Sequence, residues 1–224
     1  VLEQDPLHAP ALCGLAGLAL GRADWTNART YAEKAARRDP GSADAWYDLG
    51  VALLHLDEPA AAMAAAFKAA LTPDKDPRGF YLAGRAAMVL GDYAEALRLF
   101  DRAYWGNGCD TAARNGRLAA LLAVGNAAEA AQSAQGALEK DPADFTLKAL
   151  YALATDTCDT YAETLARDCG DVPFALQEAA CFLAGMGLYS QGARLLEAAL
   201  RQGLESPLTR YHAAWCLHKA GDAP

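Results

Sequence analysis

The sequence predicts an all-α protein built as an α-solenoid, a stack of antiparallel helix pairs with about 13 helices in all. The composition is 53% hydrophobic and much of that fraction is alanine, the residue with the highest helix propensity. β-branched residues, which favour sheets, are sparse. Signals for the start of a helix recur at a fixed interval, and such a period is the mark of a repeat architecture.

The interval is 34 residues. Four polar residues at this spacing each precede an alanine-rich run, as expected of N-caps: Asp24, Glu58, Asp92 and Asn126. A short polar side chain at this position accepts a hydrogen bond from a free amide of the first turn. Pro59, directly after Glu58, suits the first helical position, where its missing N–H costs nothing.

This register divides the chain into seven parts that we expect to form a single solenoid over residues 1–224. They are the helix pairs 9–42, 43–76, 77–110 and 111–144, a shortened pair 145–172, the pair 173–206 and the half-repeat 207–224. In the shortened pair, Thr160 and Glu163 match a capping box that would open its second helix. In the half-repeat, the spacing of Tyr211, Ala214 and Leu217 predicts an apolar stripe.

Large, small and aromatic residues alternate within the pairs in a characteristic way. The second pair reads Trp46-x-x-Leu49-Gly50-x-x-Leu53, and the third repeats the pattern from Phe80 to Gly84 and on to Phe100. This pattern resembles the tetratricopeptide repeat (TPR) superfamily, strongly over residues 9–144. The resemblance implies a right-handed superhelix in which Gly50 and Gly84 let the two helices of a pair lie close together.

The resemblance also implies a function, because TPR proteins bind partners in a concave groove lined by the first helix of each pair. We therefore expect a protein-protein interaction scaffold that binds a peptide or partner protein. Family positions carried onto this chain give the predicted contact residues Asp44, Tyr47, His55, Arg78, Tyr81, Arg85 and Asn115. Tyrosine and arginine are enriched in binding hot spots, which favours an acidic or C-terminal peptide. The alternative is that both tyrosines pack against adjacent repeats while Arg85 is solvated.

Charge and motif content argue against other functions. A formal charge of -8 and a pI near 5.0 do not favour nucleic acid or anionic membrane, and no apolar run is long enough to span a bilayer. The chain contains no H-E-x-x-H, G-x-S-x-G or phosphate-loop motif. His212 and Cys216 are four residues apart but lack further ligands nearby. We expect no enzymatic activity, no cofactor and no metal site.

The six cysteines form no C-x-x-C pair, which favours buried thiols in a reducing compartment such as the cytoplasm. A disulfide between Cys158 and Cys169 is the alternative. The chain begins at Val1 and ends where another helix would start, so we expect a segment of a longer, bacterial polypeptide. Two further functions follow from that expectation: packing against an enzymatic or carbohydrate-handling domain of the same polypeptide, and self-association into a homo-oligomer.

Overall fold

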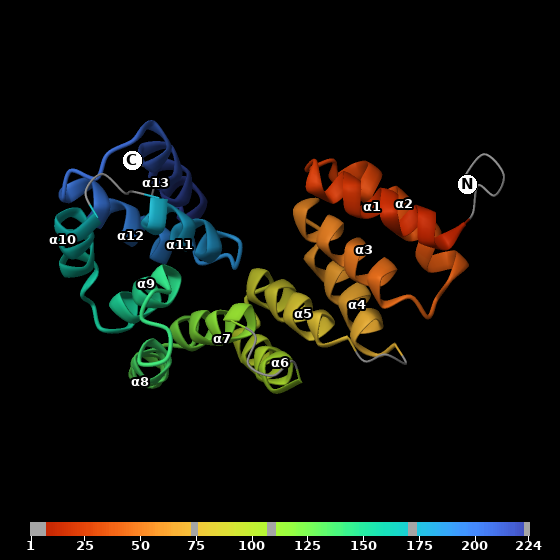
Figure 1. Cartoon of the computed structure of the whole chain (residues 1–224), viewed down its shortest axis with the longest axis horizontal. Helices are drawn as coiled ribbons and strands as arrows, with labels where there is room; N and C mark the ends of the chain where they lie inside the picture. The colour runs from red at the N-terminus through yellow and green to blue at the C-terminus, as the bar shows by residue number, and fades with distance from the viewer. Residues whose placement is uncertain (1–7, 73–75, 107–110, 170–173, 222–224) are drawn as a thin grey trace. The chain divides into compact units, whose positions relative to one another are not determined.

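The computed structural model describes residues 8–72, 76–106, 111–169 and 174–221. All regular secondary structure in these ranges is α-helical and forms 13 helices (Figure 1). The chain divides into two compact units, residues 1–114 and 115–224, with the boundary inside α7 (Thr111–Ala123).

The first unit contains three helix pairs whose starts lie 34 residues apart. These helices are α1 (Ala9–Gly21), α2 (Trp25–Arg38), α3 (Ala43–His55), α4 (Pro59–Ala70), α5 (Pro77–Val89) and α6 (Tyr93–Gly106). Each helix packs against the next in sequence, and α3 also contacts α1 and α5. The first helices of the three pairs therefore lie side by side.

Side-chain caps mark three of the four predicted helix starts. Asp24, Asp92 and Asn126 each accept a hydrogen bond from the backbone N–H three residues later, at 3.1 to 3.4 Å. Glu58 holds the N-cap position of α4 but makes no capping bond with its side chain. Its carboxylate instead accepts a hydrogen bond from Arg29 on α2, at 2.7 Å. Glu58 is therefore the N-cap residue by position, as predicted, but its longer side chain reaches the neighbouring pair instead of capping the helix.

Close approach of helices within the pairs and between neighbouring pairs depends on glycine and alanine. The four alanines expected at the second-helix contact are all buried: Ala28, Ala62, Ala96 and Ala130. A Cβ added to Gly50 would lie 2.7 Å from Leu82, and one added to Gly84 would lie 2.8 Å from the ring of Phe100. Gly79, on α5, is tighter still, since its added Cβ would lie 2.5 Å from the backbone nitrogen of Ala70 on α4.

The second unit contains the remaining helices after α7. They are α8 (Ala127–Leu138), α9 (Phe145–Ala154), α10 (Cys158–Cys169), α11 (Phe174–Ala184), α12 (Tyr189–Arg201) and α13 (Pro207–Ala220). α9 packs against α8, α10 and α11, and α12 packs against α10, α11 and α13. Two ion pairs, Arg194 with Asp156 at 2.5 Å and Arg201 with Asp159 at 2.8 Å, fasten α12 to the start of α10.

The turns inside the pairs show where the shortened repeat lost its residues. One residue in each turn has a positive φ, and these residues are Ala23, Asp57, Gly91, Gly125, Asp156 and Gly187. The first four are 34 apart, whereas Gly125, Asp156 and Gly187 are 31 apart. Since α9 has 10 residues and α7 has 13, one deletion of three lies in the first helix of the pair. The other three missing residues lie between Asp156 and Gly187.

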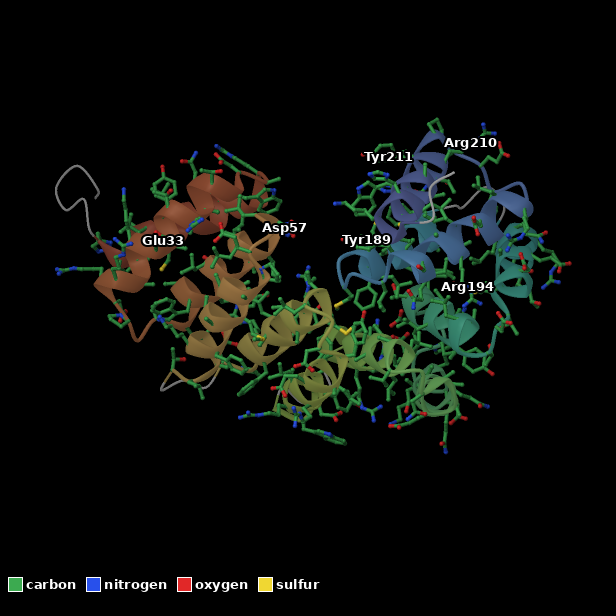
Figure 2. All side chains as sticks on the ribbon, turned by 180° about the vertical axis from the view of Figure 1, so that it is seen from behind. Glu33, Asp57, Tyr189, Arg194, Arg210 and Tyr211 are labelled. Atoms are coloured by element: carbon green, nitrogen blue, oxygen red, sulfur yellow. The ribbon has the colours of Figure 1, made fainter. Side chains whose placement is uncertain are left out.

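Two predictions about the second unit are wrong. Thr160 does not open a helix, because α10 already begins at Cys158 and the Thr160 carbonyl accepts a bond from the Thr164 hydroxyl inside it. Helix α13 buries Thr209, Ala213 and Cys216 rather than the stripe that contains Tyr211. Tyr211 is 64% exposed and, like Arg210, projects from α13 into solvent (Figure 2). Apolar residues lie on both sides of this helix, so its spacing alone does not identify the buried side.

The expectation that the cysteines are buried thiols holds for some of them. Cys158 and Cys216 are buried free thiols, Cys13 is half-buried and Cys181 is exposed, so the prediction of burial is wrong for Cys181. Cys109 lies outside the described residues, as does the side chain of Cys169. In the part of the chain that is described, no helix has both the length and the apolar character needed to cross a bilayer.

Candidate binding face

Six of the seven predicted contact residues belong to the first unit. Asp44, Tyr47 and His55 lie on α3, and Arg78, Tyr81 and Arg85 lie on α5, which contacts α3. We call the surface of α1, α3 and α5 that includes these positions the first-helix face. Asn115 lies on α7 in the second unit and is only 6% exposed. Its side chain is therefore a poor candidate for contact with a partner.

Arg78 is the centre of an ion-pair network within the face. Its guanidinium lies 2.6 Å from Asp76, directly before α5, and 2.6 Å from Asp44 on α3. The same group lies 4.9 Å from the centre of the Tyr47 ring. Hydrogen bonding to Asp76 is the main cause of a raised pKa at Arg78. This arginine is thus engaged by its own chain and orients the groups around it.

His55 and Trp25 form an aromatic pair at the other end of α3. Their rings are parallel within 6° and their centroids are 3.8 Å apart. Partial burial lowers the pKa of His55, and the charge of Arg85 lowers it further. The imidazole is therefore neutral at physiological pH and can either donate or accept a hydrogen bond. Trp25 was not among the predicted contact residues, because it belongs to the second helix of its pair.

Arg85 differs from Arg78 in having no partner of its own. Within the described ranges, it forms no ion pair or hydrogen bond, although it is half-buried. Its charge affects both His55 and Tyr47. Burial raises the pKa of Tyr47 more than Arg78 and Arg85 lower it, so the phenol keeps its proton. The result is an unpaired cation beside a phenol and a neutral imidazole.

The ring of Tyr81 packs within its own helix pair, whereas the alternative to partner contact placed it against an adjacent repeat. Its ring packs on Phe100 of α6, with centroids 5.8 Å apart and planes inclined by 50°. Phe100 is fully buried and also fills the space beside Gly84. Tyr81 is half-buried, so the part of its ring that packs on Phe100 belongs to the core of the third pair.

Asp48 is a residue of this face that the family positions missed. It is a half-buried carboxylate on α3, and burial, followed by the charge of Asp44, raises its pKa to about 6. The 34-residue register offered a signal, because the equivalent residues in neighbouring pairs are Gly14, Leu82 and Gly116. A charged residue with a raised pKa at a position that is otherwise small or apolar is a candidate functional residue.

The Asp48→Asn variant is expected to stabilise the protein by about 1 kcal/mol at pH 7.5, after allowance for solvent screening of a partly exposed group. The folded protein holds a proton on Asp48 more tightly than the unfolded chain does, so ionisation costs stability above pH 6. The gain should vanish below pH 4, where the carboxyl is protonated in both states. Asp44, Arg78, Cys13 and Tyr47 face the same region. Urea unfolding at both pH values measures the difference, and an equal gain at pH 4 would contradict this account.

The geometry provides binding groups but no assembled centre for metal chemistry. The described residues contain no group of three or more histidine, cysteine, aspartate or glutamate side chains that could hold a metal ion. His212 and Cys216 therefore have no third ligand of these types in that part of the chain. The first-helix face offers hydrogen-bond donors, aromatic rings and one unpaired charge of each sign, since Asp48 also forms no ion pair or hydrogen bond with a described residue.

Comparison with known protein families shows to which family this chain of helix pairs belongs. The tetratricopeptide repeat model matches residues 2–79 and 81–145, which together make up more than half of the chain. The chain belongs to the tetratricopeptide repeat family. A search of curated protein sequences returned no match.

Solved structures of TPR proteins share the fold. A tetratricopeptide repeat protein from Parabacteroides merdae superposes with a TM-score of 0.67 at 14% identity, covering 96% of this chain and 88% of that one. YrrB, a TPR protein described as having an unusual peptide-binding site, gives 0.54 at 20% identity, covering 94% of each chain. The Cut9–Hcn1 hetero-tetramer of the APC/C gives 0.64 at 14% identity, and the match covers 96% of this chain and 44% of that chain. The predicted all-α solenoid of TPR helix pairs is thus confirmed.

Proposed function

We propose that this TPR chain is a protein-interaction scaffold and that the first-helix face binds a peptide or a segment of a partner protein. The observation that carries the proposal is Arg85, a half-buried guanidinium on this face that forms no ion pair or hydrogen bond with any described residue. A charge that is partly removed from water without a partner costs stability. Binding offsets this cost when the partner supplies a hydrogen-bonding group of opposite charge.

The surroundings of Arg85 support the same proposal. Tyr47, His55 and Trp25 provide aromatic surface on one side of it, and Tyr, Trp and Arg are the residues most enriched in binding hot spots. Arg78 holds Asp44 in place and stacks on Tyr47, so part of the surface is ordered before a partner arrives. Such order reduces the entropy lost on binding. Peptide binding by the TPR protein YrrB is consistent with this role.

The experiment is affinity capture with the purified chain, followed by measurement of Kd for the captured partner. A double variant, Tyr47→Ala with Arg85→Ala, is expected to weaken binding roughly tenfold to a hundredfold. Arg37→Ala is the matched control, because Arg37 is an 81% exposed arginine on the second helix α2. Unchanged affinity in the double variant, or an equal loss in the control, would show that the first-helix face is not the binding surface.

A further inference from the structure

The first-helix face carries several charges, but most of them neutralise one another. Asp44, Asp76 and Arg78 form one network with short ion pairs. Arg85 and Asp48 remain, and neither forms an ion pair or a hydrogen bond with any residue that the structure describes. Both are half-buried. The face therefore keeps one unsatisfied cation and one unsatisfied anion.

These two charges lie on different helices of the face. Arg85 is on α5 and acts on His55, whereas Asp48 is on α3 and raises the pKa of Cys13 on α1. Both act on Tyr47, yet Arg85 is absent from the charges that act on Asp48. The anion is thus on α3 and the cation is on α5, the neighbouring first helix. Their separation prevents them from satisfying each other.

There is open space on α1 beside Asp48. A Cβ added to Gly14 or Gly17 would have no atom within 4 Å apart from its own helix and chain neighbours. The surface of α1 at these two glycines therefore carries no side chain that a partner would have to displace. The same glycines add no competing charge. This region favours a lysine or arginine, whose apolar stem can lie over α1 while its head group pairs with the carboxylate.

We infer that the partner segment carries charges of both signs: a basic side chain that pairs with Asp48 on α3 and a carboxylate that pairs with Arg85 on α5. This inference rests on the proposed function of the first-helix face. It replaces the simpler expectation of a purely acidic peptide, because such a peptide would bring like charge toward Asp48 and Asp44. A bound segment of this kind crosses α1, α3 and α5 instead of following one helix.

The test is selection from a displayed library of random 12-residue peptides on the purified full chain. Peptides selected on the wild type should contain a basic and an acidic residue at a preferred separation. Peptides selected on the Arg85→Gln variant should lose the preference for an acidic residue and keep the preference for a basic one. Peptides selected on Asp48→Asn should lose the preference for a basic residue and keep the preference for an acidic one. Arg37→Gln, on the opposite helix of its pair, should select the same peptides as the wild type.

Fluorescence anisotropy with one selected peptide then measures how much each variant loses in affinity. Each single variant should weaken it about tenfold, as expected for one hydrogen-bonded charge pair. Wild-type affinity should also fall between pH 7.5 and pH 5 as Asp48 is protonated, and this loss should be smaller in Asp48→Asn. Enrichment of peptides with one sign of charge alone, or an unchanged preference in either variant, overturns the inference. Failure to enrich any peptide on the wild type contradicts the proposed function itself.

Discussion

Replacement of Gly79 by alanine is expected to destabilise the protein by about 3 kcal/mol, at the upper end of the usual cost of overpacking. The added methyl group would lie 2.5 Å from the nitrogen of Ala70 and 2.6 Å from the carbonyl oxygen of Ala66. Both are backbone atoms of α4, so no side-chain rotation can relieve the clash. The whole of α5 must move away from α4. Urea unfolding followed by circular dichroism would measure the loss.

Gly14→Ala is the matched control, because Gly14 also lies in a first helix but has no neighbouring atom that an added methyl group would meet. This variant should be stabilising by roughly 0.5–1 kcal/mol, the usual gain from replacing glycine inside a helix. Stability changes of opposite sign for Gly79→Ala and Gly14→Ala would establish that contact with α4 causes the loss of stability in Gly79→Ala. A similar small gain for Gly79→Ala would mean that α4 and α5 are farther apart than the structure shows.

Truncation of Phe100 to alanine is expected to cost about 4 kcal/mol, since a fully buried aromatic ring leaves a cavity that α5 and α6 cannot close. The ring contacts the position of Gly84 and packs on Tyr81. Thermal or urea unfolding of the variant measures this effect. A loss below about 1 kcal/mol would contradict the central place of Phe100 in the third pair.

A double-mutant cycle adds a sharper test at the same contact. Gly84→Ala alone should destabilise by about 2 kcal/mol, because the new methyl group would lie 2.8 Å from the Phe100 ring. In a Phe100→Leu background the smaller side chain leaves room for that methyl group. The two substitutions together should therefore cost about 1 kcal/mol less than the sum of their separate costs. Additive costs would indicate that Gly84 is constrained by something other than Phe100.

Much of the fold can be predicted from the sequence because local signals mark the start of most helices. The register places helix starts at residues 9, 43, 77, 111 and 145, and α1, α3, α5, α7 and α9 begin there. These signals are strong, since capping residues, prolines and glycines act within a few residues. Thr160 shows their limit, because a matching motif inside a helix has the same appearance as one at its start.

The candidate face was harder to predict, because its chemistry depends on which side chains meet across pairs. Asp44 and Arg78 are 34 residues apart and hold equivalent positions on neighbouring first helices, so their ion pair follows from the register. The position of Arg85 does not follow from the register, because it depends on how the described acidic side chains are placed, and none of them forms an ion pair with it. The burial of Asn115 likewise depends on packing around α7 that no local pattern reports.

The three-residue deletion in α9 has a consequence for how this chain tolerates change in length. An α-helix repeats every 3.6 residues and rises 1.5 Å per residue, so loss of three residues shortens a helix by about 4.5 Å and rotates the remainder of that helix by only about 60° from its former direction. The apolar side therefore still points close to its original neighbours. α9 keeps its contacts with α8, α10 and α11 despite being shorter. Natural variants of this chain should gain or lose residues in steps close to a whole helical turn, and single-residue insertions within a helix should be rare.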